Sequence, residues 1–253
     1  MKPKVDPEIN ENVFLLKKYN FKNYEINAHY VYNKQNTVFY ARNGAYFKAR
    51  ISRSFLHDVD SEFVDEEQTT INGNTNGFTK LSLDYEKRIP INKKITGIVA
   101  ATTGFIFEDD LKSDDVSFTD FGFASKYFLG GSLLTPREGS YAFPGLHEDE
   151  LNVNQFIKLN LGFQFSPINN IYLTPHFNYA SVGFEDFEDY IKDVFSSDGN
   201  WAEQIETSNL FSVGATASYD SYLGPVNFDV SWVNEINKIR LFFSVGLLLN
   251  VSD

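Results

Sequence analysis

Serine hydrolase chemistry is the first possibility that the residues raise, through the stretch Gly130-Gly131-Ser132-Leu133-Leu134. An elbow-type hydrolase needs G-x-S-x-G, because a strained turn between a strand and a helix must present the serine, and it needs an acidic partner as well. This stretch lacks the closing glycine and lies in a long loop. We interpret it as a turn, and we predict no catalytic residue in this chain.

Metal binding is the second possibility, and the ligands are poorly arranged for it. The chain has no cysteine, which excludes a thiolate site. The acidic runs 58–67, 108–115 and 185–193 offer carboxylates to Ca²⁺, but none has the D-x-D-x-D-G…E order of a preformed loop. The histidines also lack ligand spacing; they are His29, His57, His147 and His176. We predict solvated loops, with no metal and no cofactor.

Electrostatic control of an interior is the third possibility. Several charged residues fall on the small, polar face of segments that alternate with period two. In a wide lumen such residues either set ion selectivity or hold an inserted loop by ion pairs. These candidate lumen residues are Lys48, Arg50, Lys80, Asp84, Glu86 and Lys158.

The elements that must position these side chains are strands, because period-two alternation dominates the chain and helical periodicity is scarce. The 25 Phe and 14 Tyr also favour pleated surfaces. We predict nine strands, with residues 13–19 as a candidate tenth. The nine cover residues 24–33, 45–55, 77–88, 94–107, 154–165, 171–181, 210–222, 225–233 and 238–250.

The connections between these strands are of two kinds. The short ones, such as SPINN (166–170), SYLGP (221–225) and RIPINKK (88–94), are rich in Pro, Gly and Asn. The long ones are acidic and cover residues 57–76, 108–151 and 182–208. If the strands run antiparallel in chain order, all short turns fall at one end and all long loops at the other. This asymmetry is typical of outer-membrane barrels.

The two faces of the last strand, KIRLFFSVGLLLN (238–250), differ in the way that a barrel requires. One face is apolar throughout, and the other carries arginine, serine, glycine and asparagine. We predict that the apolar face contacts lipid and that the mixed face lines the lumen, since only a closed barrel satisfies every backbone group of strands in hydrocarbon. No stretch approaches the roughly 18 apolar residues of a transmembrane helix. The start, MKPKVDPEINEN, is too polar for a signal peptide, so we expect a lost leader or a longer protein.

The C-terminal stretch SYDSYLGPVNFDVSWVNEINKIRLFFSVGLLL (218–249) resembles the closing three strands of the outer-membrane surface-antigen barrels, the BamA/TamA-like superfamily. The shared pattern is a strand, LGP, a strand ending in an aromatic residue, a short turn and a final F-x-x-G strand. Among these barrels, the chain is most similar to those fused behind patatin-like phospholipases. Their NTLN…YPTKG hairpin resembles residues 36–54. The resemblance implies that the last strand closes the barrel and serves as its assembly signal, through Phe243, Gly246, Leu247 and Leu249.

The same resemblance makes YFLGGSLLTPREGSYAFPGL (127–146) the sixth external loop, which would occupy the lumen. In the superfamily this loop carries an Arg-Gly pair before an aromatic residue. Here the candidates are Arg137, Gly139 and Tyr141, with the spacing between arginine and glycine off by one. If Arg137 folds inward, Asp84 and Glu86 are its candidate acceptors.

The resulting prediction is an all-β, antiparallel transmembrane β-barrel region of the outer membrane, with nine or ten visible strands of a sixteen-stranded barrel. Residues 1–20 form a lead-in that is a candidate for an additional strand, and residues 21–253 form the barrel region. Its implied partners are lipopolysaccharide, phospholipid, the barrel-assembly machinery and other envelope subunits. The net charge of −12 argues against nucleic acid.

Two other readings of the sequence remain open. One is a self-contained, porin-like channel or a subunit of an envelope assembly complex. The other is a soluble β-barrel that binds an apolar ligand. In a soluble barrel, however, the exposed face usually carries abundant Lys and Glu rather than Ser, Gly, Thr and Asn.

Overall fold

The computed structural model describes residues 16–63, 70–73, 77–109, 126–131, 138–195, 199–201, 206–234 and 236–246. The chain divides into two compact units. The smaller unit comprises residues 1–28, 51–80 and 107–125, and the larger unit comprises residues 29–50, 81–106 and 126–253. Everything that bears on the candidate site lies in the larger unit.

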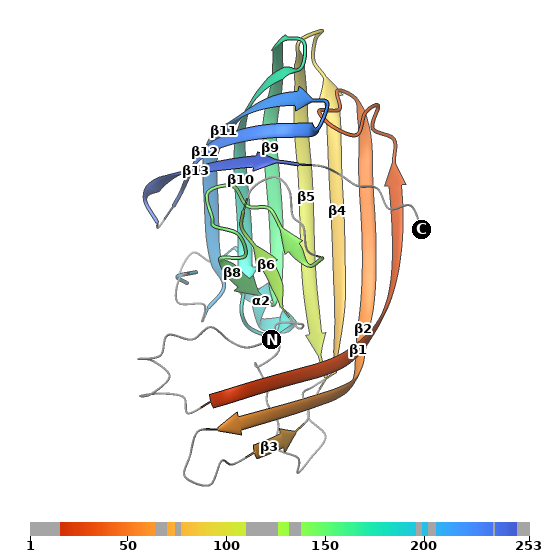
Figure 1. Ribbon diagram of the computed structural model, residues 1–253, viewed down its shortest axis with the longest axis vertical. Helices are drawn as coiled ribbons and strands as arrows, with labels where there is room; N and C mark the ends of the chain where they lie inside the picture. Colours follow the sequence, from red (N-terminus) through yellow and green to blue (C-terminus); the bar gives the residue numbers. More distant parts are fainter. Residues whose placement is uncertain are drawn as a thin grey trace. The chain divides into compact units, whose positions relative to one another are not determined.

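One large sheet contains most of the described strands, and Figure 1 shows them in chain order. Its path is β1-β2-β4-β5-β9-β10-β11-β12-β13, and the short strand β3 pairs with β2. The pairs from β5 to β13 are antiparallel. The bounds are β1 (Leu16–Asn33), β2 (Gly44–Phe63), β3 (Thr70–Gly73), β4 (Phe78–Pro90), β5 (Ile95–Glu108), β9 (Gln155–Ile168), β10 (Ile171–Gly183), β11 (Ser208–Ser221), β12 (Gly224–Val233) and β13 (Lys238–Val245).

The remaining described elements are small and lie between these strands. A three-stranded sheet is formed by β6 (Tyr127–Leu129), β7 (Ser140–Tyr141) and β8 (Leu151–Val153). The helix α2 (Phe187–Asp193) follows β10. Among the described residues, no helix has the length and the apolar character to cross a membrane.

The strand register aligns side chains of one kind into rows that cross the sheet. One row on the outer face runs from β5 to β13 and is entirely apolar: Val99, Leu161, Phe177, Val213, Trp232 and Ile239. The neighbouring row, one residue along each strand, faces inward: Ile98, Gly162, His176, Gly214, Ser231 and Arg240. Successive side chains of a strand point to opposite faces, so the register fixes both rows at once.

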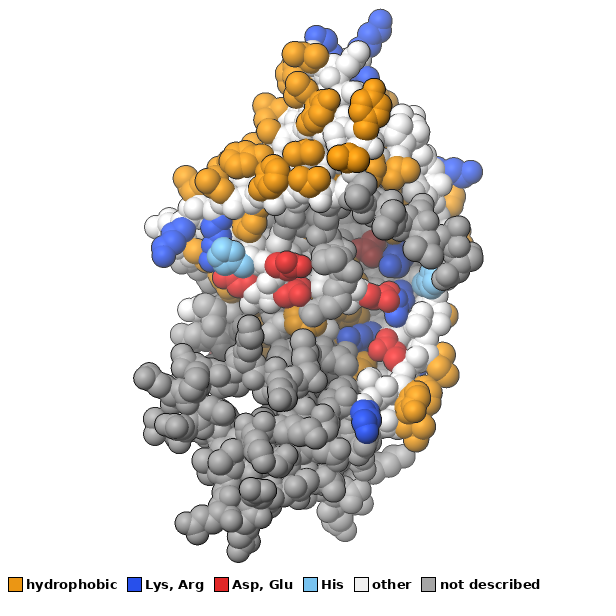
Figure 2. Space-filling view, viewed as in Figure 1, with side chains coloured by type: hydrophobic (Ala, Val, Ile, Leu, Met, Phe, Trp, Pro, Cys, Tyr) orange, Lys and Arg blue, Asp and Glu red, His pale blue; other side chains and the backbone are white. Residues whose placement is uncertain are grey.

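Exposure confirms the predicted orientation of the two faces. Leu161 and Phe163 on β9 are 49% and 56% exposed. Gln164, which directly follows Phe163, is only 3% exposed. The same contrast recurs on β12, where Asp229 is buried and Phe228 is exposed. Figure 2 shows hydrophobic side chains gathered over β11, β12 and β13. This arrangement contradicts the alternative of a soluble barrel, which would bury its apolar rows.

Each of the nine predicted strands has a counterpart, but several boundaries differ, and residues 247–250 of the last predicted strand lie outside the described residues. Strand β2 continues to Phe63 and pairs with β3, so both strands enter the range 57–76 predicted as loop. The predicted loop 108–151 contains β6 and β7 and the first residue of β8, and the predicted loop 182–208 contains α2. The sequence missed these pieces because they are too short to show a period.

The search for an additional strand gives a different answer from the one expected. Residues 16–20 belong to the first strand, β1, so the described part of residues 1–20 adds no separate strand. Between β5 and β9, the described strand β6 pairs with β7 and β8 rather than with the large sheet. A total of sixteen strands therefore stays a prediction.

A charge placed on the outer face should destabilise the fold. We expect Leu161→Arg, at the centre of β9, to lower the free energy of unfolding by about 2–4 kcal/mol, as for arginine at a bilayer midplane. Leu161→Phe is the control, because it keeps an apolar side chain of similar reach. Urea unfolding in lipid bilayers, followed by tryptophan fluorescence, measures both. Equal stability of the two variants would contradict a lipid-facing row.

Candidate functional site

The candidate site is the segment between β5 and β9, here called the inner loop (residues 126–131 and 138–153). Several of its apolar side chains are completely buried. Leu129, Phe143 and Leu146 have no exposed surface, and neither does Phe156 at the start of β9. The rings of Tyr127 and Phe156 pack edge to face at 5.4 Å between centroids. The inner loop thus supplies an apolar core that the polar inner face of the sheet lacks.

The inner loop is held by strands that lie far apart in the sheet. The Tyr127 hydroxyl donates to the carbonyl oxygen of Leu81 on β4 at 3.0 Å. From β9, Lys158 Nζ donates to the carbonyl oxygen of Ala142 at 2.8 Å. From β2, the Arg50 guanidinium forms an ion pair with Glu138. Contacts from β2, β4 and β9 to one loop mean that these strands curve around it.

Arg240 of β13 makes the most complete polar contact with the inner loop. Its Nη2 donates to Glu150 Oε1 at 3.1 Å, and its Nη1 donates to the other carboxylate oxygen and to the carbonyl oxygen of Gly145 at 3.1 Å. Glu150 also accepts the backbone N–H of His147 at 2.7 Å. Bidentate contact between arginine and a carboxylate is among the strongest of side-chain hydrogen bonds.

These contacts determine the protonation of Glu150. Burial by itself would raise the pKa of this carboxyl, but the hydrogen bonds from Arg240 and from the His147 N–H outweigh burial and hold the pKa below its ordinary value. The folded chain therefore favours the charged form of Glu150.

Gly145 allows the inner loop to approach β12 closely. Its φ is +100°, and a Cβ at this position would overlap Cγ2 of Val233. A larger residue would be strained by its backbone conformation and would also push the loop away from the strand.

The predicted loop residues are found in different environments. Tyr141 lies in β7, where its ring packs against Tyr127 and Phe156, and burial raises its pKa to about 12. Gly139 has a φ of +81° and open space around it. Arg137 lies outside the described residues.

The predicted lumen charges do not act as one group. Arg50 and Lys158 contact the inner loop directly. Asp84 lies within electrostatic range of Lys48 and Lys158. Lys80 belongs to the smaller unit, with its ammonium 5.4 Å from the ring centroid of Phe78.

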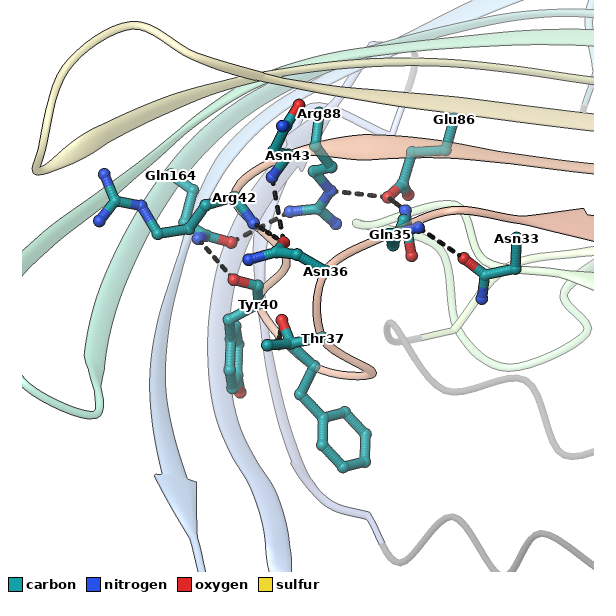
Figure 3. Close-up of polar contacts among 11 residues, drawn as sticks. Asn33, Gln35, Asn36, Thr37, Tyr40, Arg42, Asn43, Glu86, Arg88 and Gln164 are labelled. Atoms are coloured by element: carbon teal, nitrogen blue, oxygen red, sulfur yellow. Dashed lines mark hydrogen bonds and ion pairs between the residues drawn. The ribbon is translucent and has the colours of Figure 1, made fainter.

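Glu86, expected as an acceptor for Arg137, has other partners. Arg88 Nε donates to it at 2.6 Å, and Gln35 Nε2 does so at 2.6 Å. It lies close to residues 34–43, which connect β1 and β2 (Figure 3). Its proposed pairing with Arg137 therefore lacks support among the described residues.

Comparison with known families decides what kind of protein this is. A family model described as the OMP85 superfamily matches residues 4–249. The chain belongs to the OMP85 superfamily. It is accordingly an outer-membrane β-barrel protein, which confirms the predicted likeness to BamA/TamA-like barrels.

Among solved structures, this OMP85 chain matches the crystal structure of BamA from Haemophilus ducreyi lacking POTRA domains 1–3. The TM-score is 0.49 at 10% sequence identity, over 89% of this chain and 54% of that one. The chain thus spans about half the length of the solved structure. No curated protein matches the sequence.

The sequence analysis missed Arg240, Glu150 and the buried core of the inner loop. An arginine on the mixed face of the last strand was visible, and an inward cation needs an acidic partner. Its partner could not be chosen, because Glu150 lies 90 residues away along the chain. The predicted closing-strand residues are only partly described. Phe243 on β13 is 69% exposed, and Gly246 donates its N–H to the Pro225 carbonyl oxygen at 3.0 Å. Leu247 and Leu249 lie outside the described residues.

The inward-facing His176 of this OMP85 barrel belongs to a saturated network. Its Nε2 lies 2.9 Å from Asp229 Oδ2, and Asn178 Nδ2 lies 3.0 Å from its Nδ1. The amide nitrogen of Asn178 can only donate, so Nδ1 of His176 accepts its hydrogen bond. Nε2 of His176 therefore carries the ring proton and donates it to Asp229. Asp229 also accepts from Thr216 and Ser231. Both ring nitrogens are occupied, which leaves no free base.

Among the described residues, no three His, Asp or Glu side chains gather to hold a metal ion.

The charge of Glu150 should make the attachment of the inner loop sensitive to pH. Since the pKa of Glu150 is lower in the folded chain than in the unfolded chain, its contribution to stability is complete above the ordinary glutamate pKa of about 4.3 and is lost as the pH falls through its folded pKa. We expect Glu150→Gln to remove about 1 kcal/mol of stability near neutral pH and less in acid.

Urea unfolding in detergent at several pH values measures this effect. Glu148→Gln, at an exposed position of the same loop, is the matched control. If Glu150→Gln and Glu148→Gln follow the same pH dependence as the unaltered protein, the Arg240 contact does not hold the loop.

Proposed function

We propose that this chain is the membrane-embedded, non-enzymatic barrel of an outer-membrane protein, and that its inner loop fills the lumen. The observation that carries the proposal is the pairing of an outward apolar row with inward strand residues that bind the inner loop. Arg50, Lys158 and Arg240 come from β2, β9 and β13 and all reach this loop.

The mechanism is physical rather than chemical. An apolar belt of exposed side chains inserts among the lipid chains of lipopolysaccharide and phospholipid, while backbone groups pair between strands and leave none for the hydrocarbon to satisfy. The last strand, through Phe243, Gly246, Leu247 and Leu249, closes the barrel and is read by the barrel-assembly machinery. No catalytic residue is assigned to this chain.

The proposed role of this barrel is to anchor, or to help deliver, a linked domain or partner subunit. The pattern of residues 218–249 supports a linked domain of the patatin-like phospholipase type, whose serine would then lie outside this chain. A filled lumen favours an anchor over an open, porin-like channel. The coding sequence directly before Met1 tests the linked domain: a different neighbouring domain would rule out the lipase assignment without affecting the barrel.

Charge exchange between β2 and the inner loop tests the filled lumen. We expect Glu138→Arg to place two cations together and to increase protease cleavage of the inner loop in the folded protein, because opposite charges become like charges. Arg50→Glu combined with Glu138→Arg should restore protection.

Lys192→Glu on α2 is the control, since its exposed ion pair with Asp189 is separate from the inner loop. Heat-modifiable gel migration and the need for detergent establish that each variant is a folded barrel. Failure of the double variant to restore protection would remove the support from this pairing.

A further inference from the structure

The connection between β1 and β2 (residues 34–43, here called the turn plug) differs from the other turns at the same end of the sheet. The corresponding connections after β4, β9 and β11 cover only residues 91–94, 169–170 and 222–223. A tight hairpin needs no more than such lengths. The additional residues of the turn plug therefore need another explanation.

Asn36 gives the turn plug a fixed shape. Its side-chain Oδ1 accepts the backbone N–H groups of Arg42 and Asn43 at 2.9 and 3.1 Å, and its own N–H donates to the Asn43 carbonyl oxygen at 3.1 Å (Figure 3). These bonds close the segment into a compact loop with Tyr40 near its tip.

Tyr40 connects the turn plug to strands that lie far from β2 in the sheet order. Its ring stacks on Tyr172 of β10, with 4.2 Å between centroids and 14° between planes. Its hydroxyl donates to Asn227 Oδ1 of β12 at 3.0 Å. In the sheet order, β12 lies six strands from β2, which is about 29 Å along the sheet. The turn plug reaches β12 only because it crosses the space that the strands enclose.

A chain of polar side chains fixes the backbone of Tyr40 as well. The Glu86–Arg88 ion pair orients Arg88, whose Nη1 donates to Gln164 Oε1 at 3.0 Å. Gln164 Nε2 then donates to the Tyr40 carbonyl oxygen at 3.1 Å (Figure 3). Tyr40 has a φ of +48°, a conformation that costs a non-glycine residue about 1–2 kcal/mol. The surrounding contacts must offset this strain.

A cavity of about 220 Å³ lies next to the turn plug, on the side of Tyr40. Tyr40 contributes to its wall, and so does Pro144 of the inner loop. The strands between contribute the rest of the wall, which combines polar side chains such as Asn160, His176 and Ser218 with the apolar Ile98 and Ala100. The cavity is therefore bounded by the inner loop from the long-loop end and by the turn plug from the short-turn end.

We propose that the turn plug is a second closure of the lumen, at the end opposite to the inner loop, and that Tyr40 is its latch. The proposal rests on the filled lumen proposed above and adds a separate device to it. Release of Tyr40 would open the cavity to the short-turn side while Arg50, Lys158 and Arg240 still hold the inner loop.

Thiol accessibility tests this directly, because the chain has no cysteine of its own. A single cysteine is introduced by Ala100→Cys, a small substitution in the wall of the cavity on β5. The complete folded protein in detergent is treated with a charged, water-soluble thiol reagent. We expect slow labelling with the latch intact, and labelling at least about tenfold faster after Tyr40→Ala, since access follows the population of the open form.

Two further variants separate a latch from general loosening. Tyr172→Ala removes the stacking partner without changing the turn plug, and it should also accelerate labelling. Val38→Ala, at a position of the turn plug that is 72% exposed, should leave the rate unchanged. Retained heat-modifiable migration shows that the barrel is folded, and Tyr172→Ala decides the matter if Tyr40→Ala does not fold.

The outcomes distinguish this proposal from the one on which it rests. If neither Tyr40→Ala nor Tyr172→Ala changes the rate while Glu138→Arg increases it, the turn plug is not a closure, and the filled lumen stands. If Ala100→Cys in the otherwise unaltered protein reacts as fast as urea-unfolded chain, the cavity is open and both proposals fail.

Discussion

Hydrocarbon offers no hydrogen-bond partner, and this constraint determines where every polar group of the chain must go. Backbone groups pair within the sheet, and polar side chains gather on its inner face. The consequence is visible around Asp229, which is buried and accepts hydrogen bonds from His176, Thr216 and Ser231. A buried carboxylate is tolerated only with such a complete set of donors. The hydrogen bonds around Asp229 are therefore what its burial requires.

The same constraint reverses the usual position of the hydrophobic core. In a soluble sandwich, the apolar faces of strands pack against one another. Here most of these faces are turned outward, so the strands supply only part of a core, through residues such as Phe156 and Val182. The inner loop adds Phe143, Leu146 and Leu151, which are completely buried. Because a loop makes this part of the core, its position depends on the cations that hold the loop.

An interior lined by polar groups can bind its own connections from both ends. Arg240 and Lys158 hold the inner loop, while Gln164 and Asn227 hold Tyr40 of the turn plug. Each of these contacts joins a connection to a strand, and a connection as short as a tight hairpin could not make it. These contacts are the basis for the proposed closure of the lumen at both ends, which would suit an anchor better than a permanent pore.

The sequence by itself determined the strands and their faces, because alternation is a local property. The rows containing Leu161 and Phe163 could be assigned outward from their spacing alone, and both are exposed. The division into short turns and long loops followed from Pro, Gly, Asn and acidic residues in the same way. The extension of β2 to Phe63 was missed, because Asp58, Asp60 and Glu62 made this stretch resemble an acidic, solvated loop.

Only the tertiary structure decided which polar and charged residues contact one another. Glu86 was available to any inward cation, and it pairs with Arg88 on its own strand. Arg240 meets Glu150 across 90 residues, and Tyr40 meets Asn227 across 187 residues. Such pairs depend on the strand register together with the curvature of the sheet. A local pattern fixes the face on which a side chain lies, but it carries no information on what lies across the interior.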